Sequence, residues 1–274
     1  MSRRGVAALA VLLAAGAGCS REEAPDAPTR PSNEATAAPR SGPVPYTAVE
    51  TVPDGVDVPG TVKITGPIPK LKPYPVTQDT PFCGSSSRLN RSLQLGPENG
   101  VANAVVEILG IGRGKRFVGT DAVLDQKGCA FEPYVQVIKR GVKLTLRNSD
   151  PVNHNVHAYA PSAPFDDGKS SNESLFNMGM PLQGQTFPQP LDESRWGPIR
   201  IKCDAHSWMF AWVYAASSPY AEVTDTSGRF TLAAVPPGTY TLRVWHELLG
   251  SKDVPLTVEP GVAPLSIELS VAGP

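Results

Sequence analysis

Short runs in which apolar and β-branched residues alternate with polar ones recur from about residue 60 to the end of the chain. Alternation with a period of two is typical of strands that bury one face. Glycine, proline and asparagine separate the runs, as at Asn99-Gly100 and Pro236-Pro237-Gly238. The pattern predicts strands in 60–66, 104–109, 134–138, 142–147, 199–202, 229–232, 239–245 and 265–269. With 29 prolines and 25 glycines, we predict an all-β protein made of sandwiches.

A further alternating run has an aromatic face and a small, apolar face, and it covers residues 208–214. We predict that the aromatic face, with Trp208, Phe210, Trp212 and Tyr214, packs against a neighbouring sandwich. The face with Met209, Ala211 and Val213 then points into the core of its own sandwich.

Two segments lack this alternation. Residues 19–50 are rich in proline, alanine and charged residues and have few large apolar side chains, which predicts a disordered linker. Residues 173–190 are weakly patterned, and we predict a loop there. Met178 and Met180 lie in that loop, but two methionines are too few to predict a metal site of their own.

The N-terminal residues predict export. Arg3 and Arg4 precede an apolar run that is too short to span a bilayer, as in a signal peptide over residues 1–18. Gly16-Ala17-Gly18-Cys19 resembles a bacterial lipoprotein cleavage site, which implies a lipid on Cys19. We therefore expect a protein anchored by its N-terminal lipid alone and facing the periplasm or the cell surface. An ordinary signal peptide is the alternative.

The net charge of the chain is close to zero, with 25 basic and 26 acidic residues and no basic cluster. Nucleic acid is therefore excluded as a partner.

The four cysteines restrict the disulfides. If Cys19 carries lipid, Cys83, Cys129 and Cys203 remain, and three cysteines cannot all pair within one chain. The economical assignment is a Cys83–Cys129 disulfide with Cys203 left as a thiolate. An exported free thiol needs protection, and a bound metal ion would provide it.

The C-terminal part carries a family resemblance. Ala221-Glu-Val-Thr-Asp-Thr-Ser-Gly-Arg-Phe-Thr-Leu and the later Pro-Pro-Gly-Thr-Tyr-Thr-Leu resemble the second half of a carboxypeptidase regulatory-like, or transthyretin-like, β-sandwich. The first half of that pattern lies far upstream, at Gly60-Thr-Val and Ala102-Asn-Ala-Val-Val. We therefore predict one Ig/transthyretin-like sandwich made of 58–111 and 220–274, with a second domain, 112–219, inserted in it. Two tandem sandwiches are the alternative.

The inserted segment holds two motifs, His154-Asn-Val-His157 after an Asn148-Ser-Asp-Pro turn, and Cys203-Asp-Ala-His206-Ser-Trp-Met209. Together they resemble the cupredoxin family of Greek-key blue-copper proteins, most closely the amicyanin and plastocyanin group. The resemblance implies His154, Cys203, His206 and Met209 as ligands of one type 1 copper. Asn155 matches the asparagine that ties the two ligand loops together. A histidine at the position of His157 is non-ligating in the family.

The chemistry of the motifs agrees with copper. Two imidazoles and a thiolate with a weak axial thioether suit an ion that changes between Cu(I) and Cu(II). Zinc is the main alternative ion, since one cysteine and two histidines with an open fourth position would suit catalytic zinc. A methionine at this spacing, however, has no role as a zinc ligand. A trinuclear copper centre needs more histidines than the four present. We expect His246 to be a packed or partly exposed histidine of the terminal strand.

These observations predict a single-electron carrier rather than an enzyme. Trp208, next to His206, is a candidate for an apolar surface through which electrons pass to a redox protein partner. One alternative is a copper-binding or copper-buffering lipoprotein without a redox partner. Another is a surface-interaction module, in contact with carbohydrate for example, in which the metal is only structural.

Overall fold

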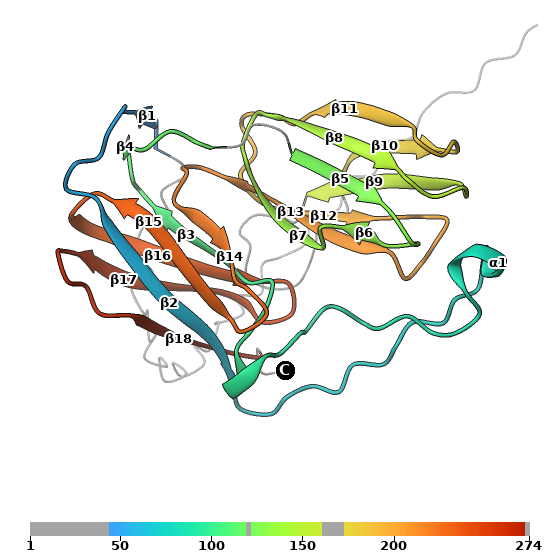
Figure 1. Ribbon diagram of the computed structural model, residues 1–274, viewed down its shortest axis with the longest axis horizontal. Coiled ribbons are helices and arrows are strands. Elements are labelled where there is room, and N and C mark those ends of the chain that lie inside the picture. Colours follow the sequence, from blue (N-terminus) through green and yellow to red (C-terminus); the bar gives the residue numbers. More distant parts are fainter. Residues whose placement is uncertain (1–43, 119–121, 161–172, 272–274) are drawn as a thin grey trace, which may run out of the picture. The chain divides into compact units, whose positions relative to one another are not determined.

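The computed structural model describes residues 44–118, 122–160 and 173–271 of the chain. Residues 1–18, Cys19 and most of the predicted linker 19–50 lie outside these ranges. Strands dominate the described chain, which confirms the predicted all-β class (Figure 1). Within it, no helix is long and apolar enough to cross a membrane.

Nine strands form two sheets around one apolar core, and we call this unit the central sandwich. One sheet has the order β10-β9-β12-β13-β7 and the other has the order β11-β8-β5-β6. Both sheets contribute buried side chains to the same cluster, for example Leu146 from one sheet and Ile201 from the other. The strands are β5 (Ala122–Gln126), β6 (Phe131–Glu132), β7 (Val135–Lys139), β8 (Lys143–Asn148), β9 (His154–Ala160), β10 (Glu173–Met180), β11 (Thr186–Pro190), β12 (Gly197–Lys202) and β13 (Phe210–Ala216).

Seven further strands form the second unit, which we call the terminal sandwich. Its sheets have the orders β14-β3-β16-β17 and β15-β2-β18, and they share an almost wholly aliphatic core. The strands are β2 (Val56–Thr65), β3 (Val105–Leu109), β14 (Ala221–Val223), β15 (Arg229–Val235), β16 (Gly238–His246), β17 (Gly250–Val258) and β18 (Leu265–Ser270). A separate parallel pair joins β1 (Thr47–Ala48) and β4 (Arg113–Gly114).

The pairing of β2 and β3 bears on the domain organisation. Strand β2 pairs with β15 and β18, and β3 pairs with β14 and β16. The segments before and after the central sandwich therefore share both sheets of the terminal one. This pairing supports the split-domain hypothesis over tandem sandwiches, and its boundaries 58–111, 112–219 and 220–274 stay predictions.

Most of the chain between β2 and β3 forms a long excursion, and we call its residues 66–96 the strap (Figure 1). It carries the one-turn helix α1 (Thr80–Cys83) and returns through the 3₁₀ turn η1 (Pro97–Asn99). A disulfide links Cys83 of the strap to Cys129 of the central sandwich, with the Cα atoms 5.5 Å apart. The predicted disulfide is thus confirmed, and Cys203 is a free, buried cysteine.

Strand β13 has the two faces that the sequence predicts. Ala211 and Val213 belong to the core of the central sandwich. Trp212 and Tyr214 instead cluster with Trp245 of β16, at ring-centroid distances of 5.0 and 6.0 Å. Aromatic pairs at such distances add to the energy of simple burial.

The loop predicted for residues 173–190 is wrong, because β10 and β11 occupy most of it. Both strands lie at the edges of their sheets. An edge strand buries few side chains and tolerates proline, so its alternation is weak. Pro188 and Pro190 in β11 are examples.

Candidate metal centre

The four predicted ligands lie at one end of the central sandwich. His154 is the first residue of β9, and Cys203 directly follows β12. His206 and Met209 lie in the short connection to β13. All four are buried, with exposures of 2% or less. Two backbone hydrogen bonds close the connection, from Met209 N to His206 O and from Cys203 N to Met209 O.

Three of these side chains converge on one point. The Nδ1 atoms of His154 and His206 are 2.9 Å apart, and the two rings meet edge to face. The sulfur of Cys203 lies 4.0 Å from His154 Nδ1 and 3.7 Å from His206 Nδ1. Such a cluster of buried nitrogen and sulfur atoms has the donor set of a soft transition-metal site.

The outer nitrogen of each imidazole faces a carboxylate. His154 Nε2 lies 3.0 Å from Asp150 Oδ2, and His206 Nε2 lies 2.7 Å from Asp79 Oδ2. Because a carboxylate only accepts, each Nε2 is the donor and each Nδ1 is left with its lone pair. Two lone pairs that face each other at 2.9 Å repel unless a cation lies against both. The residues present therefore fit a metal ion bound through both Nδ1 atoms and the sulfur.

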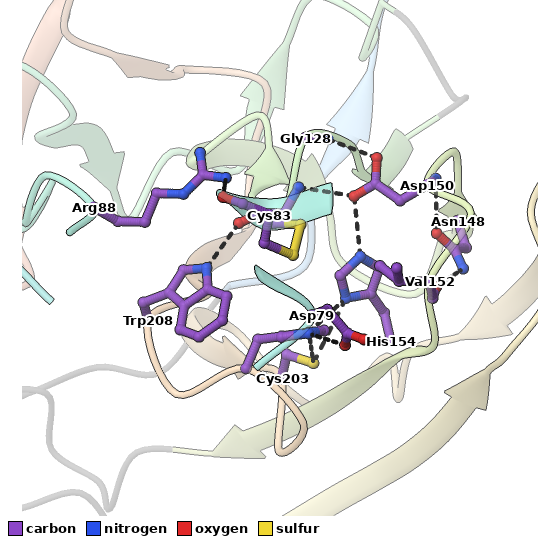
Figure 2. Close-up of a disulfide and its surroundings, with 12 residues drawn as sticks. Asp79, Cys83, Arg88, Gly128, Asn148, Asp150, Val152, His154, Cys203 and Trp208 are labelled. Atoms are coloured by element: carbon purple, nitrogen blue, oxygen red, sulfur yellow. Dashed lines mark hydrogen bonds and ion pairs between the residues drawn. A yellow bond between two sulfur atoms is a disulfide. The ribbon is translucent and has the colours of Figure 1, made fainter. Parts of the chain in front are cut away.

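Asp150 is itself held in place (Figure 2). Its carboxylate accepts hydrogen bonds from the backbone N–H groups of Gly128, at 2.6 Å, and Cys129, at 2.8 Å. Its own N–H donates to Asn148 Oδ1. Sequence reasoning identified this stretch as a turn but missed the role of Asp150. The sequence did contain a signal for this role, because Asp150 lies four residues before the candidate ligand His154.

Asn155 contacts the loop after β12 through its side chain and its backbone. Its Oδ1 accepts hydrogen bonds from Asp204 N at 2.6 Å and from the Cys203 sulfur at 3.3 Å. Its backbone N–H points at the same sulfur, at 3.5 Å. Asn155 therefore connects the beginning of β9 to the loop after β12, and so connects two of the predicted ligands.

Burial governs the protonation of the isolated site. It raises the pKa of the Cys203 thiol, against backbone N–H groups that lower it. Burial also lowers the pKa of His154, although Asp150 opposes this. The thiolate that a metal needs is therefore disfavoured without a cation, and metal binding would release its proton.

The two buried methionines have different surroundings. Both belong to the core cluster that contains Cys203. Met209 is 1% exposed and lies on the connection that carries Cys203 and His206, and its axial role stays a prediction. Met180 lies opposite His154 in the β9–β10 register, where its sulfur accepts a hydrogen bond from Gln126 Nε2 at 3.0 Å.

The other two histidines lie outside this cluster. His157 joins a partly exposed polar network in which its Nδ1 lies 2.7 Å from Asp204 Oδ2 and its Nε2 lies 2.9 Å from Ser174 Oγ. Burial would raise the pKa of Asp204, but hydrogen bonds to neighbouring side chains, including His157 and Lys202, lower it to about 2. His246 is buried in the terminal sandwich, and burial lowers its pKa to about 4.

Trp208 is only 6% exposed. Its ring lies 4.9 Å from that of His206, and its indole N–H donates to Cys129 O at 3.1 Å (Figure 2). The expected apolar surface at Trp208 does not match this burial, because the indole is enclosed beside the disulfide. Asp79 is the residue that sequence reasoning had no means to find, since it lies 127 residues from His206.

No family model matches the chain, and no curated protein matches its sequence. Similar solved structures include amicyanins and a cupredoxin. A reduced Cu(I) form of a mutant amicyanin is 19% identical, with 36% of this chain and 86% of that chain covered and a TM-score of 0.29. Amicyanin from Paracoccus versutus is 17% identical, with 35% and 80% covered and a TM-score of 0.28.

A purple cupredoxin from Nitrosopumilus maritimus is 24% identical, with 35% of this chain and 100% of that chain covered and a TM-score of 0.28. Likenesses at these identities and TM-scores carry no argument about function. The arrangement of the chain's own residues is therefore the basis for its function.

Proposed function

We propose that this protein is an exported, lipid-anchored single-electron carrier with one type 1 copper. His154, His206 and Cys203 would hold the ion, and Met209 would be its weak axial ligand. The observation that carries the proposal is the convergence of two Nδ1 lone pairs and one sulfur at a buried point. Copper bound there would supply the change between Cu(II) and Cu(I), and a protein partner would exchange the electron.

The residues of the chain keep this point rigid. Asp150 and Asp79 fix the two imidazoles from outside, and Asn155 ties the thiolate loop to β9. Ligands held by a β scaffold and its hydrogen bonds rearrange little when the charge of the ion changes. All four predicted ligands are buried, so no position is open to a substrate, and we propose a carrier rather than an enzyme.

Storage of copper is the second candidate, and the enclosure of the site favours it. His206 has no exposed surface, and the neighbouring Trp208 is only 6% exposed. A partner therefore has no direct contact with the ligand edge. A protein that buffers copper without a redox partner would have the same enclosure.

Titration of the metal-free, full-length protein with Cu(II) separates the candidates. We expect an intense blue thiolate-to-copper band and a narrow hyperfine splitting in electron paramagnetic resonance. Cys203→Ser should abolish the band. Ser207→Ala, which changes an exposed residue of the same loop, should keep it and is the matched control.

A colourless product would contradict the electron-transfer proposal. Tight Cu(I) binding without electron exchange would favour the storage function. A preference for zinc would contradict both copper functions.

A further inference from the structure

The strap is connected at both ends to strands of the terminal sandwich, but its side chains contact the central sandwich. Strands β2 and β3, which it connects, lie in the terminal sandwich. Its own Cys83, however, is disulfide-bonded to Cys129, and Tyr74 and Val76 pack with the core of the central sandwich. The ring of Tyr74 lies 5.4 Å from that of Phe210. The strap is therefore fastened to the sandwich that holds the candidate metal centre.

Asp79 occupies an unusual place on the strap. It precedes α1 in the N-cap position, where an aspartate side chain ordinarily accepts a hydrogen bond from the helix backbone. Here the side chain makes no such bond, and the residue has a left-handed conformation with φ 47° and ψ 35°. A non-glycine residue in that region is uncommon. Its carboxylate is directed at His206 Nε2 instead, at 2.7 Å.

We propose that Asp79 is a positioning residue of the metal centre, and that the strap makes the terminal sandwich part of that centre. This inference rests on the proposed copper site. Because Asp79 accepts from Nε2, the proton of His206 is kept on the outer nitrogen and Nδ1 stays free for the metal. The centre would thus be completed by a residue that no strand of the central sandwich supplies.

The negative charge of Asp79 has a second, directional effect. A carboxylate bonded to a ligand imidazole makes it a stronger donor, and this favours Cu(II) over Cu(I). Loss of outer partners typically costs 10- to 100-fold in metal affinity. Since the Asp79 side chain is 43% exposed, solvent screens its charge, and we expect the lower end. A tenfold loss confined to Cu(II) raises the reduction potential by about 59 mV.

The test compares three variants of the full-length, copper-loaded protein. Asp79→Asn keeps an acceptor for Nε2 but removes the charge, whereas Asp79→Ala removes both. Glu259→Gln removes the same charge from an exposed residue between β17 and β18 and is the control. Reduction potential and electron paramagnetic resonance are measured for each.

We expect the potential to rise by about 59 mV in both Asp79 variants and to stay unchanged in Glu259→Gln. The hyperfine pattern should change only in Asp79→Ala, where the imidazole is free to turn. A wild-type potential and spectrum in Asp79→Ala would overturn the positioning role while leaving the blue band, and with it the proposed function, intact.

A copper-free measurement keeps the two proposals separate. Nitrogen-15 NMR of the imidazoles reports which nitrogen of His206 carries a proton. In the wild type we expect a protonated Nε2, and in Asp79→Ala a substantial share of molecules with the proton on Nδ1 alone. A wild-type Nε2 without a proton would overturn the inference whether or not the protein forms a blue copper site.

Discussion

The two sandwiches arrange their buried polar side chains differently. In the terminal sandwich, Glu107 of β3 and His246 of β16 are buried but lie outside its apolar cluster. The core of the terminal sandwich is made almost wholly of valine, isoleucine and leucine. The central sandwich buries a comparable aliphatic core, but at one end it also buries Gln126, Asn148, Asp150, His154 and His206 together with the Cys203 thiol. Burial of polar groups costs free energy unless they are paired, so their concentration at one place indicates a site rather than a structural accident.

The comparison also shows how such a site is supported. Asp150 and Asn148 are held by the central sandwich itself, whereas Asp79 comes from the strap between β2 and β3. A scaffold with a hydrocarbon core can therefore contribute to a polar site in its neighbour through one connection. Substitutions in each region test this division of roles.

The double substitution Cys83→Ser with Cys129→Ser should have the largest effect. The disulfide closes a sequence separation of 46 residues, and on the chain-entropy model its loss lowers the free energy of unfolding by about 4 kcal/mol. Chemical denaturation measures this. Amide hydrogen exchange should accelerate in β9 and β12 but not in β16, which lies in the terminal sandwich.

If exchange accelerates equally in both sandwiches, the disulfide supports the whole molecule and the division of roles is wrong. Wild-type protein treated with a reductant should behave as the double variant does.

Acidification should weaken the terminal sandwich through His246. Burial lowers the pKa of this histidine from 6.5 to about 4, so the unfolded chain binds its proton more readily. The stabilisation is complete above pH 6.5 and is lost as the pH falls towards 4. At about 1.4 kcal/mol for each tenfold change in proton affinity, the loss amounts to roughly 3 kcal/mol.

Denaturation at several pH values measures this loss, and the difference between the wild type and a variant without the His246 imidazole isolates its contribution from that of other titrating groups. In the wild type, the backbone N–H of Leu248 donates to His246 Nδ1. The variant His246→Asn keeps an acceptor for this N–H, but its side chain does not titrate. An equal pH dependence in this variant would remove His246 from the explanation.

Asn155→Ala should weaken the metal centre more than it weakens the fold. The substitution removes the Oδ1 atom that accepts from the backbone N–H of Asp204, so the loop that carries Cys203 loses its tie to β9. We expect copper affinity to fall about 10- to 100-fold, as measured by competition with a chelator. Asn177→Ala, which changes a neighbouring residue of the exposed network, is the control, and an equal loss in both would contradict a specific role of Asn155.

His157→Ala should have the smallest effect. His157 lies on the same strand as His154, but its nitrogens bond Asp204 and Ser174 away from the candidate centre. We expect an unchanged visible spectrum and a loss of stability of about 1 kcal/mol from the hydrogen bonds that disappear. Loss of the blue band would make His157 a ligand and would require a new assignment.

Local patterns predicted most of the fold. Period-two alternation identified β2, β16 and the two faces of β13, because a strand that buries one face must alternate. The same rule failed for β10 and β11, since edge strands bury few side chains. Trp208 was misjudged for a related reason: its place beside a candidate ligand gave no information about what encloses it.

The sequence by itself determined the local part of the site. Cys203, His206 and Met209 lie on one short connection, so their proximity follows from their spacing alone. The Cys83–Cys129 pair could be predicted once Cys19 was assigned to lipid and Cys203 was kept as a thiolate. Only the tertiary structure decided that His154 meets this connection at 2.9 Å and that Asp79 reaches His206 from 127 residues away. Local patterns record periodicity and turns, whereas such contacts depend on the path of the strap and on the pairing of distant strands.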